Sequence, residues 1–348
     1  MAKNLSIDDL LESLTHEGEQ DSSGAFTLDI AKATEKIRAF QLADPFHYCL
    51  RWLQAAVSGG GSFFGWESNP SGVKLRILGF QLEAQVIPRL PGLLFDSAAS
   101  PAQRHLSAGL NAVIRTKARA VHITSGGARG SWRPGGYQHQ LLGKPVQGIK
   151  IELERTRGDT LGELWYAANH HFVGAKPGTA NYRDREQRLL HARGACAPLQ
   201  IEVQGFSPEW QPLYQPPKGA LDHLLSLVLY PILPSHPFKV EKWLLHNQAD
   251  QGFLPPQKCW AENTRKSPPT RCRIYYAHPK APHQHSFLYA IRDGVMLPVQ
   301  EILKGQSGSV FLADVNHLNT DLSGLQLIQD EAYRSLLEEL RGLLAKSS

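Results

Sequence analysis

The sequence has little cysteine, and its cysteines lack the close spacing that metal sites and redox centres use. The chain has four cysteines, Cys49, Cys196, Cys259 and Cys272, and none of them belongs to a Cys-x-x-Cys pair. In a chain of 348 residues this spacing favours reduced thiols over a disulfide framework.

The segment HPKAPHQH contains three histidines, His278, His283 and His285. Together with the two later cysteines, these histidines could serve as zinc ligands. Structural zinc sites usually contain a closely spaced pair of ligands, and this spacing matches no familiar zinc module. We therefore predict no metal site.

The sequence also lacks a long uninterrupted apolar run. The longest, residues 221–233, is broken by Asp222, His223 and Pro231 and is too short to span a bilayer. Residues 1–24 are acidic and have no apolar core of the kind that a signal peptide needs. We therefore expect a cytoplasmic protein without a membrane partner.

Two common catalytic motifs are missing as well. The glycine-rich stretch GGGSFFGWE, residues 59–67, is not followed by the Lys-Ser or Lys-Thr of a P-loop. No Gly-x-Ser-x-Gly nucleophile elbow occurs anywhere in the chain. The glycines at 59–61 follow an apolar helical pattern directly, so we interpret them as the end of a helix.

The composition is that of a folded protein with an uneven distribution of charge. Hydrophobic residues make up 42% of the chain and charged residues 20%, which is typical of globular domains. The net charge of +5 combines an acidic start and a basic middle. Residues 1–35 hold two bases and eight acids (2 − 8 = −6), and residues 100–193 hold fifteen bases and six acids (15 − 6 = +9). The basic middle is either a solvated surface or an attraction for nucleic acid or another acidic partner.

Hydrophobic periodicity predicts both helices and strands in each half of the chain. Apolar residues at helical spacing predict helices over 26–41, 44–59, 105–118, 160–173, 219–233 and 331–346, and a helix interrupted by Pro88 over 81–95. Alternating patterns predict strands over 72–80, 120–127, 148–156, 198–206, 271–277, 286–299 and 307–315. Proline, asparagine and glutamine are frequent in residues 248–272, which we expect to form a long loop.

This mixture of helices and distantly pairing strands indicates an α+β fold. We divide the chain into an acidic flexible tail at residues 1–24, a first domain at 25–158 and a second α+β domain at 159–348.

Two separate stretches carry a resemblance to one superfamily. The first combines the helix–glycine–strand order of residues 46–80 with HLSAGLNAVIRTKARAVHITSGG, residues 105–127. In it, residues 109–112 stand where a glycine-rich segment opens a helix, and residues 121–124 form the strand that follows. This arrangement resembles the ATP-binding domain of the GHKL superfamily, which includes gyrase, the ninety-kilodalton heat-shock chaperones, histidine kinases and MutL.

The second stretch, residues 286–344, resembles the end of the middle domain of those chaperones, where a pair of strands precedes a long helix. The chain as a whole is also similar to bacterial proteins described as chaperone-like or ATPase-like. The resemblance implies an N-terminal Bergerat-type α/β sandwich, followed by a domain like the chaperone middle domain.

The resemblance also implies where a nucleotide pocket would lie, and there the reactive groups of the family are replaced. Trp52 stands at the position of the carboxylate that orients the attacking water, and Ala56 stands at that of the asparagine that holds Mg²⁺. No carboxylate follows the strand at residues 72–78, and Gly324 replaces an arginine of the middle domain. The positions that correspond to the pocket are Trp52, Ala56, Leu78, Gly79, Gly109, Asn111 and Thr124.

Tryptophan and alanine can neither activate water nor bind a metal, so the resemblance implies a GHKL frame with a degenerate ATP-binding site and no catalytic residue. We expect Trp52 to turn inward and to fill space, because an empty apolar cavity is unfavourable. We expect no cofactor, although ATP remains an alternative.

Three functional interpretations follow from the sequence. The first is a non-catalytic chaperone-like or scaffold protein that acts on a protein partner or client. The second is a diverged ATP-binding protein, either a weak ATPase or a nucleotide sensor. The third is a nucleic-acid-associated factor that uses the basic middle region.

Overall fold

The computed structural model describes residues 45–347, with gaps at 70, 117, 156–185, 188, 191–192, 195, 205–239, 254–271, 280–285, 304–308 and 322. The predicted acidic tail and the helices predicted over 26–41, 160–173 and 219–233 lie outside the described residues. So do Cys259, His283 and His285, and nothing is described of the His278 side chain.

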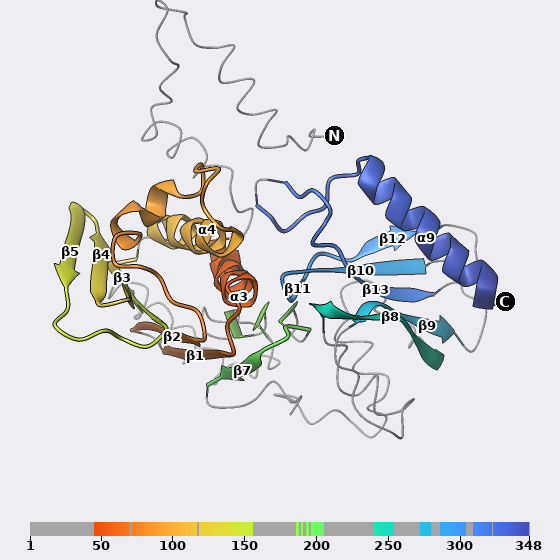
Figure 1. The fold of residues 1–348 in the computed structure, drawn as a ribbon, viewed down its shortest axis with the longest axis horizontal. Helices are drawn as coiled ribbons and strands as arrows, with labels where there is room; N and C mark the ends of the chain where they lie inside the picture. The colour runs from red at the N-terminus through yellow and green to blue at the C-terminus, as the bar shows by residue number, and fades with distance from the viewer. Residues whose placement is uncertain are drawn as a thin grey trace, which may run out of the picture.

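A mixed sheet of seven strands forms the first half of the molecule (Figure 1). Its strand order is β5-β4-β3-β6-β2-β1-β7, and every neighbouring pair is antiparallel except β1 and β7, which are parallel. The strands are β1 Phe63–Asn69, β2 Gly72–Leu78, β3 Ala120–Ser125, β4 Ala128–Arg133, β5 Gly136–Leu141, β6 Ile149–Glu154 and β7 Gln200–Val203.

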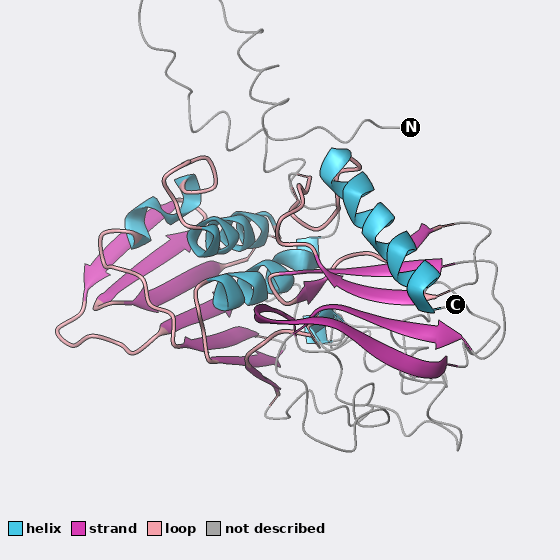
Figure 2. Cartoon of the chain, turned by 45° about the vertical axis from the view of Figure 1, so that its right-hand side comes forward, coloured by secondary structure: helices cyan, strands magenta, loops and turns pink. Residues whose placement is uncertain are grey.

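Two helices, α3 (Tyr48–Ser58) and α4 (Pro101–Arg115), cover one face of this sheet (Figure 2). The α3 helix ends where the glycines begin: the Gly59 backbone N–H donates to the Ala55 carbonyl, and Gly60 has a φ of 73°. A capping box formed by Ser100 and Gln103 fixes the start of α4. The predicted α+β class is thus confirmed for the described residues from 45 to 155, whose strands form an antiparallel sheet with both helices on one face.

The helix predicted over 81–95 is wrong. The segment instead forms a short 3-10 helix, η2 (Ile87–Gly92), flanked by turns and irregular structure. Two prolines, Pro88 and Pro91, explain the difference, because each lacks the backbone N–H that an α-helix interior needs. The buried Ile87 and Leu90 supply the apolar pattern that suggested a longer helix.

A second sheet of six strands forms the other half of the molecule. Five strands follow the order β11-β10-β13-β9-β8, and β12 pairs with β10. The strands are β8 Val240–Phe253, β9 Cys272–Pro279, β10 Ser286–Arg292, β11 Val295–Met296, β12 Gln300–Ile302 and β13 Val310–Asp314. Because β8 continues to Phe253, the loop predicted from residue 248 onward begins later than expected.

The final helix, α9 (Glu331–Ser347), runs beside the second sheet (Figure 1). Its buried leucines include Leu336, Leu340 and Leu344, and Leu337 packs against the core from a half-buried position. This confirms the apolar face expected for the C-terminal helix.

The domain boundary at residue 158 stays a prediction, but one strand beyond it belongs to the first sheet. Strand β7 pairs with β1, and a buried ion pair fixes the chain that leads to it. There Arg155 Nη2 donates to both carboxylate oxygens of Glu186, at 2.9 and 2.8 Å, and the Tyr48 hydroxyl also donates to Glu186. Residues 186–204 are thereby attached to the first half of the molecule.

The two halves share one continuous hydrophobic core, and a hairpin turn of the second sheet contacts the helices of the first. The turn joins β10 to β11 through Asp293 and Gly294, which have φ values of 46° and 73°. A Cβ on Gly294 would lie 2.7 Å from the Ala197 Cα and 3.0 Å from the Val57 Cγ2. The Gln54 side chain of α3 also donates to the Arg292 carbonyl at 3.3 Å. The turn therefore lies so close to α3 that only glycine fits at position 294 without a shift of its neighbours.

None of the helices in the described residues has the length and apolarity needed to cross a membrane. The cysteines that the structure describes, Cys49, Cys196 and Cys272, are buried and form no disulfide bond with one another. Nor does any group of three or more potential metal ligands occur among the residues that were placed.

Candidate functional site

Trp52, the first of the predicted pocket positions, belongs to α3 and is completely buried against α4. A Cβ added to Gly109 would lie 2.4 Å from the Trp52 Nε1 atom, so the indole lies directly against the α4 backbone. The ring also packs edge-on against Tyr48, with centroids 4.9 Å apart, and against Trp66 at 6.3 Å. The expectation that Trp52 turns inward is confirmed.

Ala56 and Asn111, two further predicted pocket positions, are also buried in this helical layer. The Asn111 amide donates to the Pro91 carbonyl at 2.9 Å, which ties α4 to η2. Its polar group therefore has a structural contact in the protein.

The other predicted positions lie on the sheet. Leu78 ends β2, and its carbonyl accepts from the Ser62 N–H at 2.8 Å. Gly79 follows with a φ of 82°, in a tight turn where an added Cβ would lie 2.8 Å from the Ser62 nitrogen. Thr124 is half-buried in β3. Of the seven predicted positions, the structure thus brings Trp52 and Gly109 into direct contact, and none of the seven lines the cavity described next.

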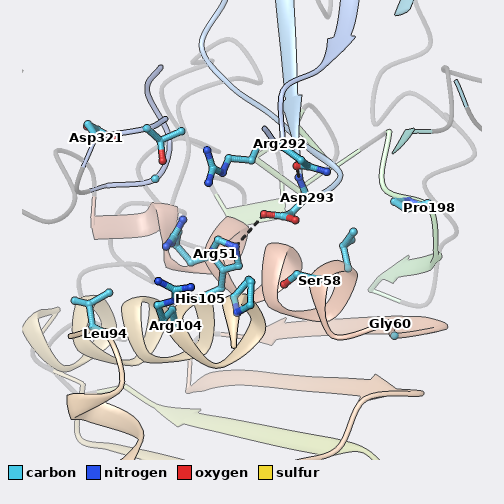
Figure 3. A pocket seen from close by; sticks show the side chains of 16 residues that line it. Arg51, Ser58, Gly60, Leu94, Arg104, His105, Pro198, Arg292, Asp293 and Asp321 are labelled. Carbon is cyan, nitrogen blue, oxygen red and sulfur yellow. Dashed lines mark hydrogen bonds and ion pairs between the residues drawn. The ribbon is translucent and has the colours of Figure 1, made fainter. Parts of the chain in front are cut away.

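A cavity of about 660 Å³ lies instead between the helices of the first sheet and the loops of the second. Its charged residues come from both halves of the molecule (Figure 3). Helices α3 and α4, the β10–β11 turn and the loop after β13 contribute Arg51, Arg104, His105, Arg292, Asp293 and Asp321. The sequence analysis named none of these six.

His105 and Asp293 form a contact between the two halves inside this cavity. The His105 Nε2 and Asp293 Oδ2 atoms are 3.0 Å apart (Figure 3). Burial, together with the nearby positive charge of Arg51, lowers the pKa of His105 to about 4 despite the bond to Asp293. Burial of Asp293 acts to raise its pKa, but the hydrogen bond from His105 and the charges of His105, Arg292 and Arg51 outweigh it, and the net pKa is lowered.

At neutral pH the pair is therefore a neutral imidazole beside an ionised carboxylate. An ionised carboxylate only accepts hydrogen bonds, so Nε2 carries the proton and donates it to Asp293. The other ring nitrogen of His105, Nδ1, is then an acceptor, and it is buried without a hydrogen-bond partner among the described residues. His105 thus joins the two halves through one nitrogen and leaves the other unused.

Arg51 is buried in the same cavity, with only 5% of its surface exposed. Its Nη1 donates to the Gln54 side chain at 2.8 Å, whereas its Nε has no partner among the placed residues. Burial, followed by the charge of Arg292, lowers the pKa of Arg51 to about 10, so the guanidinium stays charged at neutral pH. Gly324 makes room for it: a Cβ there would lie 2.0 Å from the Arg51 Nη1.

The sequence offered two signals for these residues. Arg51 is the one charge within the otherwise apolar stretch 48–57, and such a residue must find a polar environment when the helix is buried. The Asp-Gly pair at 293–294 is the preferred sequence for a tight hairpin turn. That the turn would meet α4 at His105 could not be read locally, because the contact joins residues 188 positions apart.

No protein-family model matches the sequence, and no curated protein is similar to it at the sequence level. Among solved structures, the ATPase region of Saccharomyces cerevisiae topoisomerase II aligns with a TM-score of 0.45 and 9% sequence identity, over 81% of this chain and 76% of that chain. The same region bound to ICRF-187 (dexrazoxane) gives the same score and identity, over 81% of this chain and 77% of that chain.

Proposed function

We propose that this protein is a non-catalytic interaction protein, of the chaperone-like or scaffold type, built on a GHKL-like frame whose nucleotide site is filled. It works through a protein partner or client and hydrolyses no ATP. The observation that carries the proposal is the packing of Trp52 against Gly109 in the helical layer.

The order of the elements supports the GHKL-like frame. Residues 48–154 contain the helix α3, the β1–β2 hairpin, the helix α4 and then the four antiparallel strands β3 to β6. This is the order that the sequence resemblance implies. One detail differs from the expectation: residues 109–112 do not open a helix, because α4 begins at Pro101 and Gly109 lies in its middle.

The filled site follows from size and chemistry. The indole of Trp52 has no exposed surface, and it contacts both Tyr48 and Trp66, so a ligand could enter its space only by displacing a packed aromatic cluster. Displacement of a buried Trp side chain costs several kcal/mol, roughly 3–5 by comparison with Trp→Ala substitutions. Ala56 offers no oxygen or nitrogen for a metal ion on the same helix.

A protein partner has an available edge on the first sheet. Strand β5 is the last strand of that sheet in the described residues, and all six of its residues are exposed. Leu141 at its end is 71% exposed. Edge strands present backbone groups that an extended segment of another protein can pair with, which favours a protein partner.

The proposal is tested by measuring phosphate release from ATP and Mg²⁺ by the purified chain. We expect no turnover above the buffer background, because no group at the Trp52 and Ala56 positions can orient water or hold the metal. Two variants serve as controls: Thr124→Ala at a predicted pocket position, and Arg133→Gln on the exposed end of β4. Turnover that is lost in Thr124→Ala and kept in Arg133→Gln would contradict the proposal.

A further inference from the structure

The cavity between the two halves carries an unbalanced and largely unpaired group of arginines. The cavity is lined by Arg51, Arg104 and Arg292. Among the described residues, none of the three has a carboxylate within ion-pair distance. Burial lowers the pKa of both Arg51 and Arg292, and the charges of Arg292 on Arg51 and of Arg104 on Arg292 act in the same direction, whereas the charge of Asp293 opposes both shifts. Unpaired guanidinium groups gathered in one cavity are unfavourable unless an anion offsets them.

Two polar atoms in the cavity wall are buried without a partner in the part of the chain that the structure describes. They are the Arg51 Nε, which is a donor, and the His105 Nδ1, which is an acceptor. Arg51 has only 5% of its surface exposed, and His105 has 7%. Buried polar atoms are nearly always hydrogen-bonded in native proteins, so the two orphaned atoms indicate a ligand that both accepts and donates.

The two aspartates in the cavity wall set the charge of that ligand. Asp293 faces His105, and the Asp321 Oδ1 accepts from the Ser323 hydroxyl at 2.6 Å and from the Gln326 N–H at 3.2 Å in its own turn. With His105 neutral, the charged lining residues sum to 3 − 2 = +1. This balance suits a single phosphate group and opposes a polyphosphate, whose additional charges would face the two carboxylates.

We propose that the cavity between the α3–α4 layer and the β10–β11 turn binds a small molecule that carries one phosphate group. The phosphate oxygens accept from Arg51, Arg104 and Arg292, and a hydroxyl of the ligand donates to the His105 Nδ1. Arginine suits this purpose because its planar group of donors matches phosphate oxygens in pairs. The N-terminal turn of α4, which contributes Arg104 and His105, adds the positive end of a helix dipole.

The site joins both halves of the protein, and this gives the ligand a structural consequence. Arg51, Arg104 and His105 belong to the helical layer of the first sheet, whereas Arg292 and Asp293 belong to the second (Figure 3). A phosphate bound to arginines of both halves stabilises their present arrangement by mass action. Binding of the ligand is therefore expected to raise the midpoint temperature of unfolding of the whole chain.

The experiment is a calorimetric titration of the full chain at neutral pH, in a buffer free of phosphate, with three probes in turn: inorganic phosphate, glycerol 3-phosphate and tripolyphosphate. We expect saturable binding of one glycerol 3-phosphate per chain, at least tenfold tighter than that of tripolyphosphate. Inorganic phosphate should compete with glycerol 3-phosphate, because both use the same arginines. No heat with any probe, or preference for tripolyphosphate, would overturn the proposal.

Matched variants separate the site from general attraction of anions. Arg104 is exposed, so Arg104→Gln removes a cavity charge without disturbing the core, and Arg133→Gln removes the same charge from a distant exposed position. Loss of a charge-assisted hydrogen bond predicts that Arg104→Gln weakens the binding of glycerol 3-phosphate about tenfold or more, while Arg133→Gln binds like the unmodified chain. Equal affinities of the two variants would overturn the assignment. The ATPase measurement concerns other residues, so either proposal can fail alone.

Discussion

At the scale of single residues, Trp52 and Gly109 form the contact on which the fate of the nucleotide site depends. The absence of a side chain at position 109 lets the indole lie against α4, where a Cβ would come within 2.4 Å of Nε1. Glycine inside a helix is otherwise unfavourable by about 0.5–1 kcal/mol relative to alanine. The packed ring therefore accounts for a residue that the helix alone would not prefer.

This pairing predicts a reversal of sign in a double-mutant cycle. Trp52→Ala should lower the free energy of unfolding by roughly 3–5 kcal/mol, as expected for a buried aromatic residue. Gly109→Ala should lower it by about 1–3 kcal/mol in the presence of Trp52, because the added methyl group overpacks the core. In the Trp52→Ala background, the same Gly109→Ala change should raise it by about 0.5–1 kcal/mol. Urea denaturation of the four chains measures all three values.

Gly342→Ala provides the control for helix propensity. Gly342 lies in α9 with nothing within 4 Å of its added Cβ, so its replacement should be stabilising by the same amount with and without Trp52. Additive effects of Trp52→Ala and Gly109→Ala would show that the ring and the glycine are not in contact, and the filled site would lose its main support.

At the scale of elements, the β10–β11 hairpin turn and the start of α4 connect the two sheets. The turn carries Asp293 to His105, and its backbone is held by the Asn316 side chain, which accepts from the Asp293 N–H at 2.7 Å. The charged groups that face His105 are Asp293, Arg51 and Arg292. Because two of these three are cationic and the site is buried, protonation of His105 is opposed.

Stability should therefore fall as the pH is lowered through the weakly acidic range. The folded chain holds His105 neutral down to a pKa of about 4, whereas the ordinary value is 6.5. Between these values the unfolded chain binds more protons, so the free energy of unfolding decreases as the pH falls from about 6.5 to about 4. At about 1.4 kcal/mol per pH unit, the full effect is roughly 3 kcal/mol. Below this range the lowered pKa of Asp293 adds a loss in the same direction.

The variant His105→Gln isolates this contribution. Glutamine has an amide N–H that can still donate to Asp293, but it does not titrate. Between pH 7 and 4, the free energy of unfolding should therefore change less with pH for His105→Gln than for the unmodified chain. The control His139→Gln, on the exposed β5, should leave this pH dependence unchanged. An unaltered slope in His105→Gln would contradict a neutral, buried His105.

The elements that the sequence predicts well are those with local signals. The glycines at 59–61 end α3, and the leucine face of α9 is clear from its spacing. The predicted start of α4 is four residues too late, because the helix begins at Pro101, where Ser100 and Gln103 form a capping box, and not at 105. The error at residues 81–95 arose from apolar spacing that outweighed two prolines. Local patterns identify elements, and they fail where proline chemistry competes with hydrophobic periodicity.

The candidate site escaped prediction because its residues are distant in sequence. Arg51 and His105 lie on two helices of the first half, and Asp293 lies on a turn of the second. The pairing of β7 with β1 is similarly long-range. By contrast, the inward position of Trp52 could be anticipated, because an apolar residue in a buried helix has one favourable environment.

At the scale of the whole molecule, two sheets share one hydrophobic core. Two different regions bear on its function: the predicted pocket positions and the charged cavity. Trp52, one of the predicted pocket positions, is packed against Tyr48 and Trp66, and the charged cavity lies between the halves. The account assigns protein interaction to the frame and ligand binding to the cavity. A nucleotide that entered the predicted pocket positions would overturn this division.

The most direct test is a calorimetric titration with a nonhydrolysable ATP analogue and Mg²⁺, performed on the unmodified chain and on Arg104→Gln. The Arg104→Gln variant weakens any binding through the charged cavity by about tenfold or more, so binding that is equally tight in both chains reports on the site that Trp52 fills. The account predicts that no saturable binding of the analogue persists unweakened in Arg104→Gln. Saturable binding of one analogue per chain that is equally tight in that variant, with a change in tryptophan fluorescence that disappears in Trp52→Phe, would contradict it.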